Sequence, residues 1–222
     1  ATPYSPGAFD VVLPKASIQA DIFGNAIDQS SIGKPISTWF GHCTNVPLYS
    51  IYEGGAGDDY VHDFLIGYGT IRATTSSITI TSDDGTSVRT MHSSEYTVYD
   101  GSQVTPYPGY AFVRFTREQR DGSGRLCTLR ATLQGISYLG DYYTANPVRI
   151  LQLLLTDTTW GLGLTVNASS FNTAAALFDN DDWWVGGGLH DFKKASEWID
   201  YLLAACRFSL LVPGTGSGLM LT

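Results

Sequence analysis

The spacing of apolar residues changes once along the chain, near residue 144, and this change limits the folds that the sequence can adopt. Before it, apolar and polar residues alternate in short runs separated by Gly and Asp, as in residues 77–81 and 127–133. After it, apolar residues recur every three or four positions, as in residues 195–206. A period of two is typical of half-buried strands and a period of 3.6 of helices. We therefore expect an α+β fold in which the strands precede the helices.

The composition of the chain and the positions of its Gly and Pro residues divide it into three parts. Residues 1–35 are rich in Pro, Gly and Ser, and we expect an N-terminal arm or linker with little core of its own that packs on something else. Residues 36–143 are expected to form a β-rich domain, an antiparallel β-sandwich or barrel. Residues 144–222 are expected to form an α/β region with three helices. We expect this region to continue in a longer protein.

Three helix starts are predicted from capping residues. Asn146 is placed to cap a helix whose first position is Pro147, where a missing N–H costs no hydrogen bond. Ser170 is predicted to cap a second helix over residues 171–178. Asp191 is predicted to open the third and longest helix.

The strand candidates differ in how regular they are. Residues 110–115 are rich in aromatic side chains, and residues 208–212 are predicted to turn at Pro213-Gly214 and pair with residues 219–221. Residues 46–52 are strand-like but contain Pro47. Because proline cannot donate to a sheet ladder, we expect an edge strand or a strand start there.

The net charge of −8 argues against binding of nucleic acid. The longest run of basic residues is the pair Lys193-Lys194, whereas binding to nucleic acid needs a basic face. An acidic surface instead suits the wall of a channel that DNA passes without sticking. No apolar stretch approaches the ~18 residues of a membrane span, so we expect no membrane segment.

Adjacent acids in two Gly-rich loops are the candidates for hydrolysis. Glycoside hydrolysis uses two carboxyl groups across a cleft, one of them in an apolar pocket that raises its pKa. Asp58-Asp59 and Asp83-Asp84 lie beside glycines, where neighbouring side chains tend to point apart and to remain in water. We therefore expect no catalytic residues and no enzymatic activity.

The remaining candidates for a site are similarly weak. Asp179-Asn180-Asp181-Asp182 resembles a calcium loop, but Trp184 and His190 occupy the places of the required Gly and Glu, which favours a solvated helix end. Trp183-Trp184 suits either a sugar platform or a packing wedge, and we favour the wedge. The histidines and cysteines lack metal-site spacing, so we expect three buried thiols and no metal or cofactor. These residues are His42, His62, His92, His190, Cys43, Cys127 and Cys206.

Several segments resemble the tail hub and tip proteins of bacteriophages, a group that includes the tip attachment proteins of long-tailed phages. Residues 146–163, NPVRILQLLLTDTTWGLG, resemble the run NP…LLT(N/D)…(Y/W)GLG of these proteins. Residues 169–175, SSFNTAA, match the following (A/S)SFxxAA helix, and an amphipathic helix over residues 198–207 comes next, as in that group.

Two earlier segments extend the resemblance. Gly33-Lys34-Pro35-Ile36 with Phe40-Gly41 and Asn45-Val46 is similar to the opening GKPIPxxFGxxxNV of one tail-protein group. Residues 107–115, YPGYAFVRF, are similar to its YPGYAxxRF segment. The segments follow one order and span residues 33 to 212. The run over residues 146–163 is the most specific of them.

The resemblance implies an architectural role with no catalytic residues. It implies a ring, most simply a homotrimer, at the end of the tail tube, through which the tape measure protein and DNA pass without specific DNA binding. The implied partners are the distal tail protein, the tape measure protein and a fibre or spike, in the virion tail and, during assembly, in the host cytoplasm. The motif residues expected to act structurally are Asn146, Pro147, Trp160, Gly161, Gly163 and Phe171.

Two other functions stay open at this point. One is a tail-associated cell-wall or capsule hydrolase, and the other is a carbohydrate-binding module for host attachment. If the tail-hub reading holds, residues 158–163 should turn back onto the β-domain with Trp160 buried. Gly161 and Gly163 should then serve close backbone approach or positive φ.

Overall fold

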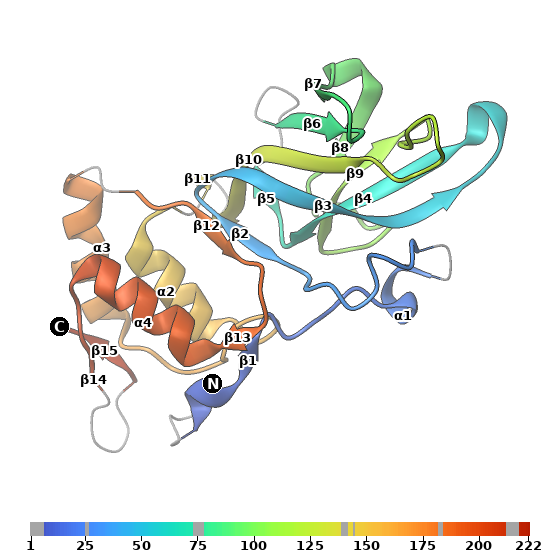
Figure 1. Ribbon diagram of the computed structural model, residues 1–222. Coiled ribbons are helices and arrows are strands. Elements are labelled where there is room, and N and C mark those ends of the chain that lie inside the picture. Colours follow the sequence, from blue (N-terminus) through green and yellow to red (C-terminus); the bar gives the residue numbers. More distant parts are fainter. Residues whose placement is uncertain are drawn as a thin grey trace.

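The chain folds into a curled half-barrel of antiparallel strands that lies beside a smaller helical region (Figure 1). The computed structural model describes residues 7–24, 27–72, 78–138, 142–143, 145–181, 184–211 and 218–222. The predicted α+β class is confirmed. Most strands precede the longer helices, but a short helix at Ala20–Phe23 comes before the sheet, and short strands lie between and after the longer helices. The strand-rich part has the curvature of an open barrel and is not a two-sheet sandwich.

One long sheet makes the half-barrel. Its main path runs β7-β6-β10-β3-β4-β9-β8, and β5 and β11 pair with β10. Alternating side chains put the apolar ones on the concave face, where Phe64, Val113 and Phe115 are fully buried. The strands are β3 (His42–Gly54), β4 (Val61–Tyr68), β5 (Ile71–Arg72), β6 (Thr79–Asp83), β7 (Val88–Thr90), β8 (Tyr96–Tyr99), β9 (Tyr110–Phe115), β10 (Thr128–Tyr138) and β11 (Tyr142–Tyr143).

The prediction that Pro47 marks an edge strand or a strand start is wrong for the strand as a whole. β3 begins five residues earlier, at His42, and lies between β10 and β4 at the centre of the sheet. Pro47 pairs with Arg130 of β10, whereas the pairing of β3 with β4 starts at Tyr49. Proline is tolerated at this position because β3 is paired there on one side only, with β10.

The helical region stacks three helices, with α2 (Pro147–Thr156) in contact with both α3 (Ala168–Asn180) and α4 (Ala195–Cys206). As predicted, α2 buries Val148, Leu151 and Leu155 on one face. After α4, β14 (Leu210–Leu211) pairs with β15 (Met220–Leu221), which confirms the predicted strand pair. The predicted turn between them lies outside the described residues. No helix in the described ranges is long and apolar enough to span a membrane.

Two of the three predicted helix starts are wrong. α3 begins at Ala168, and its N-cap is Asn167, whose side chain accepts from the backbone N–H of Ser170. Ser170 is therefore inside the first turn, and its hydroxyl donates to the Asn167 carbonyl. α4 begins at Ala195 and not at Asp191, and α3 is one residue longer. The residues before α4 are held in a strand instead of a helical turn.

That strand is paired by the N-terminal segment, which is not a separate arm. β1 (Val12–Leu13) pairs with β13 (Lys193–Lys194), and β2 (Thr38–Phe40) pairs with β12 (Gly187–Leu189). Between these strands the chain makes the short helix α1 (Ala20–Phe23) and lies beneath the half-barrel (Figure 1). Two short 3-10 helices, Ala8–Asp10 and Gly57–Asp59, and a third at Ser93–Glu95 complete the elements.

The expectation that residues 1–35 have little core of their own is wrong for the described part. Ile18, Phe23 and Ile27 are buried against Leu65 and Phe112 on the convex side of the sheet. This second apolar cluster forms because the sheet is apolar on both faces at β4 and β9. The N-terminal segment thus packs on its own chain.

Candidate functional site

A polar cleft lies where the loop between β9 and β10 faces the β6–β7 hairpin. It encloses about 500 Å³ and is lined by hydroxyl, carboxylate and guanidinium groups, among them Ser82, Arg89, Arg117 and Glu118. Cys127 also lines it. Such a lining suits polar ligands or water and gives little apolar surface for a hydrophobic ligand.

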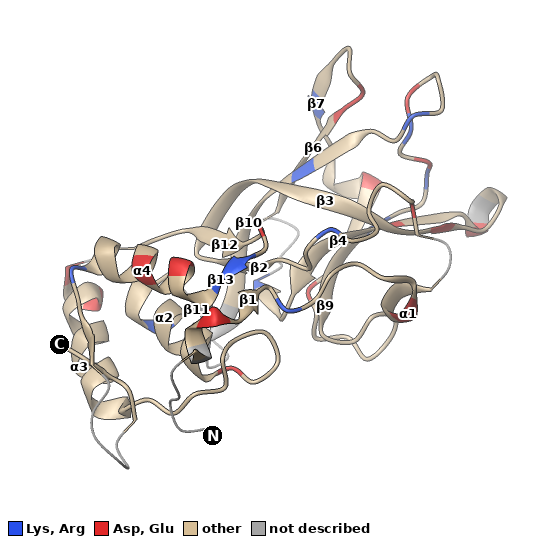
Figure 2. Ribbon diagram, turned by 60° about the horizontal axis from the view of Figure 1, so that its bottom comes forward, with Lys and Arg blue, Asp and Glu red and all other residues tan. Residues whose placement is uncertain are grey.

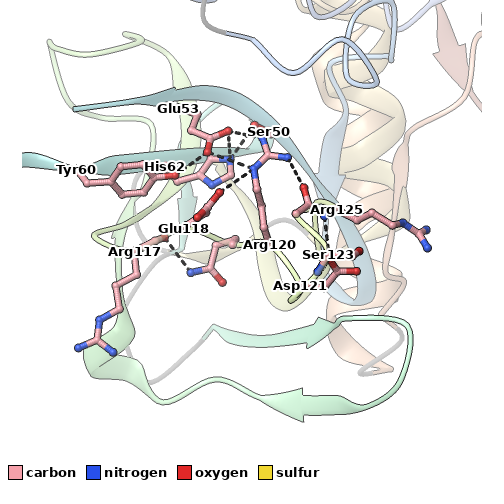
Figure 3. A network of polar contacts seen from close by, with 12 residues as sticks. Ser50, Glu53, Tyr60, His62, Arg117, Glu118, Arg120, Asp121, Ser123 and Arg125 are labelled. Atoms are coloured by element: carbon pink, nitrogen blue, oxygen red, sulfur yellow. Dashed lines mark hydrogen bonds and ion pairs between the residues drawn. The ribbon is translucent and has the colours of Figure 1, made fainter. Parts of the chain in front are cut away.

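The loop is tied to the β3–β4 hairpin by one carboxylate (Figure 3). Arg120 donates from Nε to Glu53 Oε1 at 3.3 Å and from a terminal nitrogen to Glu53 Oε2 at 2.5 Å. The Tyr60 hydroxyl donates to Glu53 Oε1 at 2.8 Å. The hydrogen bond from Arg120 is the largest influence on Glu53 and keeps its pKa below the ordinary value. Glu53 is therefore ionised at neutral pH.

His62 lies beneath this carboxylate and is fully buried. Its Nε2 is 3.0 Å from Ser50 Oγ and 4.0 Å from Glu53 Oε2, while its Nδ1 has no hydrogen-bond partner within the described ranges. Burial lowers the pKa of His62 to about 4, against the opposing pull of Glu53. The imidazole is therefore neutral at physiological pH.

The Ser50–His62 pair has the residue types of a nucleophile and its base but not their setting. A catalytic histidine is oriented by a third group on its other nitrogen, and its serine must reach a substrate. Ser50 is only 1% exposed, and no described side chain bonds His62 Nδ1. The pair is arranged as a buried structural contact.

His62 and Asp63 are neighbours on β4, and their side chains face opposite ways. Asp63 points to the convex face, where both its oxygens accept from Arg114, at 2.7 Å each. The Arg114 guanidinium also lies 5.4 Å from the centre of the Tyr99 ring. Asp63 is fully buried, so this two-bond pair supplies the partner that a buried charge requires.

The candidate acids lie in short local elements, Asp58-Asp59 in the 3-10 helix Gly57–Asp59 and Asp83-Asp84 at the end of β6. Asp59 is exposed, and the side chain of Asp58 lies outside the description. Asp84 accepts from the backbone N–H groups of Thr86 and Ser87 within its own turn. The hydrogen bonds from Thr86 lower the pKa of Asp84 to about 2, the opposite of what a general acid needs.

The residues of the calcium-like run 179–182 do not share one environment. Asp179 and Asn180 end α3, and Asp179 accepts from the Asn146 side chain at 2.8 Å. Asp182 and Trp183 lie outside the described residues. Trp184 is 51% exposed, so the packing-wedge interpretation is wrong for this residue.

Of the thiols and histidines, Cys43 lies beside His42 and His190, with which it lines one pocket. The cysteines Cys43 and Cys206 are buried and Cys127 is partly buried, and all three are free. Burial raises the pKa of the Cys43 and Cys206 thiols, which makes them poor nucleophiles. Across the part of the chain that the structure describes, no group of three His, Cys, Asp or Glu side chains is placed to hold a metal ion.

The run over residues 146–163 folds as the motif predicts at its start. Asn146 caps α2, with its side-chain oxygen accepting from the N–H groups of Val148 and Arg149, and Pro147 occupies the first position. The amide nitrogen of Asn146 donates to the Ala175 carbonyl in α3 at 3.0 Å. One buried side chain thus fixes two helices.

The end of the run turns back as predicted. Trp160 is buried, and its ring centre lies 5.5 Å from that of Phe40 in β2. Gly163 has φ of 66°, and Gly161 leaves room for helix carbonyls, because a Cβ there would lie 2.5 Å from Leu154 O. Phe171 is fully buried in the same core. The motif residues therefore act through packing.

An apolar groove lies beside α4. It encloses about 110 Å³ between α4, α2 and β12, and its lining includes Trp198, Tyr201 and Leu202. Gly187 and Gly188 of β12 carry no side chains that would cover it. Tyr201 is 73% exposed at its rim, so aromatic surface is left open to solvent.

No family model, curated protein or solved structure matches this chain. The geometry of the residues is therefore the basis for judging function. Two features were missed from the sequence, the network around His62 and the groove on α4. The network joins residues from β3, β4 and the β9–β10 loop, which no spacing rule connects. The groove had a signal in Trp198, Tyr201, Leu202 and Ala205, which follow helical spacing.

Proposed function

We propose that this protein is a structural subunit of a bacteriophage tail tip or baseplate hub that acts by assembly. In this proposal its copies form part of the ring at the end of the tail tube, most simply as a homotrimer. Its neighbours are the distal tail protein, the tape measure protein and a fibre or spike. The residues that carry the resemblance, Asn146 to Gly163, have packing roles, which fits an architectural protein.

The observation that carries the proposal is the apolar groove on α4. Tyr201 exposes a large aromatic surface at its rim. Contiguous apolar surface of this kind is typical of a contact with another protein chain. Aromatic side chains also contribute strongly where two proteins meet. We assign the groove to the contact with a neighbouring tail subunit.

Charge bears on the channel part of the proposal. The chain carries a net charge of −8, and Lys and Arg lie interspersed with Asp and Glu over the loops of the half-barrel and the helical region (Figure 2). Repeated around a ring, such subunits would repel DNA weakly, which suits a conduit because strong phosphate contacts would hold the genome back. The hairpin over residues 53–59 and the turn at Asp83-Asp84 are our candidates for this lining or for outer contacts.

Cryo-electron microscopy of intact tails tests the proposal directly. We expect density for this chain in a ring around the tail axis, with α4 against a neighbouring chain. A position outside the tube, away from the axis, would contradict the conduit. Turnover of peptidoglycan by the purified protein would instead support a hydrolase, and specific signals on a glycan array would support a carbohydrate-binding module.

A further inference from the structure

Beside the polar cleft, Arg120 ties the loop between β9 and β10 to the β3–β4 hairpin, while Leu126 and Cys127 at the end of the loop pack against the main core. Arg120 is the loop residue whose side chain reaches the β3–β4 hairpin, and both of its contacts there are to Glu53. Arg120 also lies 3.2 Å from Glu118 of the same loop. Loop residues 116–122 line one wall of the cleft. The Glu53–Arg120 contact therefore helps to hold that wall against the β3–β4 hairpin.

A second proton on His62 does not fit this closed arrangement. The imidazolium has two N–H groups, but among the residues that the structure describes, Ser50 Oγ is a partner for Nε2 and none is placed to bond Nδ1. The proton on Nδ1 would be buried without an acceptor, at a cost in free energy that exposure to water removes. The added charge would also compete with Arg120 for Glu53, 4.0 Å away.

Charged groups around His62 come from several elements. Glu53 from β3 favours the imidazolium, and Arg120 from the loop opposes it. Asp63, on the other face of the same strand, and Asp28, from the N-terminal segment, favour it more weakly. Tyr60 packs edge-on to the ring, and Phe64 covers it at 4.3 Å between ring centres. Desolvation outweighs the carboxylates, so the closed state keeps the ring neutral.

We propose that Glu53, His62 and Arg120 form an acid-operated latch, in which proton uptake by His62 releases the loop over residues 116–127 and opens the polar cleft. The step transfers one proton from solvent to the imidazole and breaks no covalent bond. Glu53 then exchanges its contact with Arg120 for water or the imidazolium. This inference stands independently of the proposed assembly function.

The sign of the pH dependence follows from the two states. His62 titrates at about 4 in the closed state and near 6.5 when it reaches water. Between these pH values the open state therefore binds more protons than the closed state. The free-energy difference that favours the closed state decreases as the pH falls from 6.5 towards 4. The ratio of closed to open forms should fall roughly a hundred-fold across this window.

Hydrogen–deuterium exchange measured between pH 7 and pH 4 tests the latch. After correction for intrinsic exchange rates, amide protection over residues 116–127 should fall in the wild type, while protection in α2 persists. His62→Gln should keep the loop protected at pH 4, because glutamine bonds Ser50 without titrating. The control His42→Gln changes an exposed histidine of the neighbouring strand β3 and should retain the acid response. Glu53→Gln should loosen the loop already at pH 7.

Two results would overturn the proposal. One is a wild-type loop equally protected at pH 7 and pH 4 with α2 intact, and the other is an acid response unchanged in His62→Gln. If that variant fails to fold, NMR of the wild type decides. The His62 ring and the loop amides should then titrate with one midpoint, and separate midpoints would show that other groups open the loop.

Discussion

At the scale of single residues, two glycines close together in sequence serve different physical needs. Gly163 has a positive φ, a conformation in which a side chain is strained. Gly161 does not, and its role is space: a Cβ there would lie 2.5 Å from Leu154 O and 2.8 Å from Asp157 O. This turn passes so close to the end of α2 that Leu162 N donates to Leu154 O. The motif thus encodes a close backbone contact.

We therefore predict that Gly161→Ala destabilises the protein by about 1–3 kcal/mol, since overpacking forces the turn away from α2. The matched control is Gly187→Ala, because an added Cβ at Gly187 meets no atom within 4 Å. Denaturant unfolding of both variants measures the difference. Equal stabilities of the two variants would show that the turn yields freely.

At the scale of elements, Asn146 shows how one cap can organise two helices. Its oxygen accepts from the first turn of α2, and its nitrogen donates to the Ala175 carbonyl and to Asp179 in α3. Asn167 makes the simpler cap, with one bond to the Ser170 N–H of its own helix. A comparison of the two asparagines therefore distinguishes the effect of capping one helix from the effect of hydrogen bonds between two helices.

Asn146→Ala should cost more than Asn167→Ala. An ordinary cap is worth about 1 kcal/mol, and loss of Asn146 also removes its hydrogen bonds to the Ala175 carbonyl and to Asp179, each worth about 0.5–1.5 kcal/mol. Thermal unfolding of both variants checks the order. If Asn167→Ala proves as costly, the bonds from Asn146 to α3 contribute nothing measurable.

At the scale of the whole molecule, the N-terminal segment joins the two regions. Leu13 of β1 is fully buried in the main core, whereas its neighbour Val12 is 47% exposed. β1 pairs with β13 just before α4, and β2 pairs with β12. The chain start is thus part of the fold of the helical region.

Leu13→Ala is expected to destabilise the protein by about 2–4 kcal/mol through the cavity that it leaves. Val12→Ala, one residue away on the exposed face, should change stability by less than about 0.5 kcal/mol. Guanidine titrations followed by tryptophan fluorescence report on this region, because Trp160 and Trp198 lie in it. A neutral Leu13→Ala would show that β1 is dispensable.

Assembly gives a further prediction at this scale. Tyr201→Asp places a charge at the rim of the α4 groove, and we expect the variant to fold but to enter tails poorly. Val88→Asp is the control, since Val88 is 68% exposed on β7 in the half-barrel. Tail incorporation of both proteins is measured by mass spectrometry of purified virions. Normal incorporation of Tyr201→Asp would remove the groove from the assembly contact.

The sequence predicted what local patterns control. The strand over residues 110–115 and the cap at Asn146 were correct, because alternation and capping act within a few residues. Asp191 failed as a helix start because Val12 pairs with Lys194, a contact that spans nearly the whole chain. The His62 network was missed for the same reason, since Arg120 reaches Glu53 from a distant loop.

The pairing of Val12 with Lys194 also has a consequence for how the protein is made on the ribosome. The first strand emerges early, but its partner is translated only after more than a dozen other elements. Until then β1 and β2 expose unpaired edges and Leu13 stays uncovered, a state that invites association with other nascent chains. Closing so long a loop also slows this pairing. Ribosome-bound intermediates should therefore contain a formed half-barrel, while β1 and β2 remain unpaired until residues 187–194 have been translated.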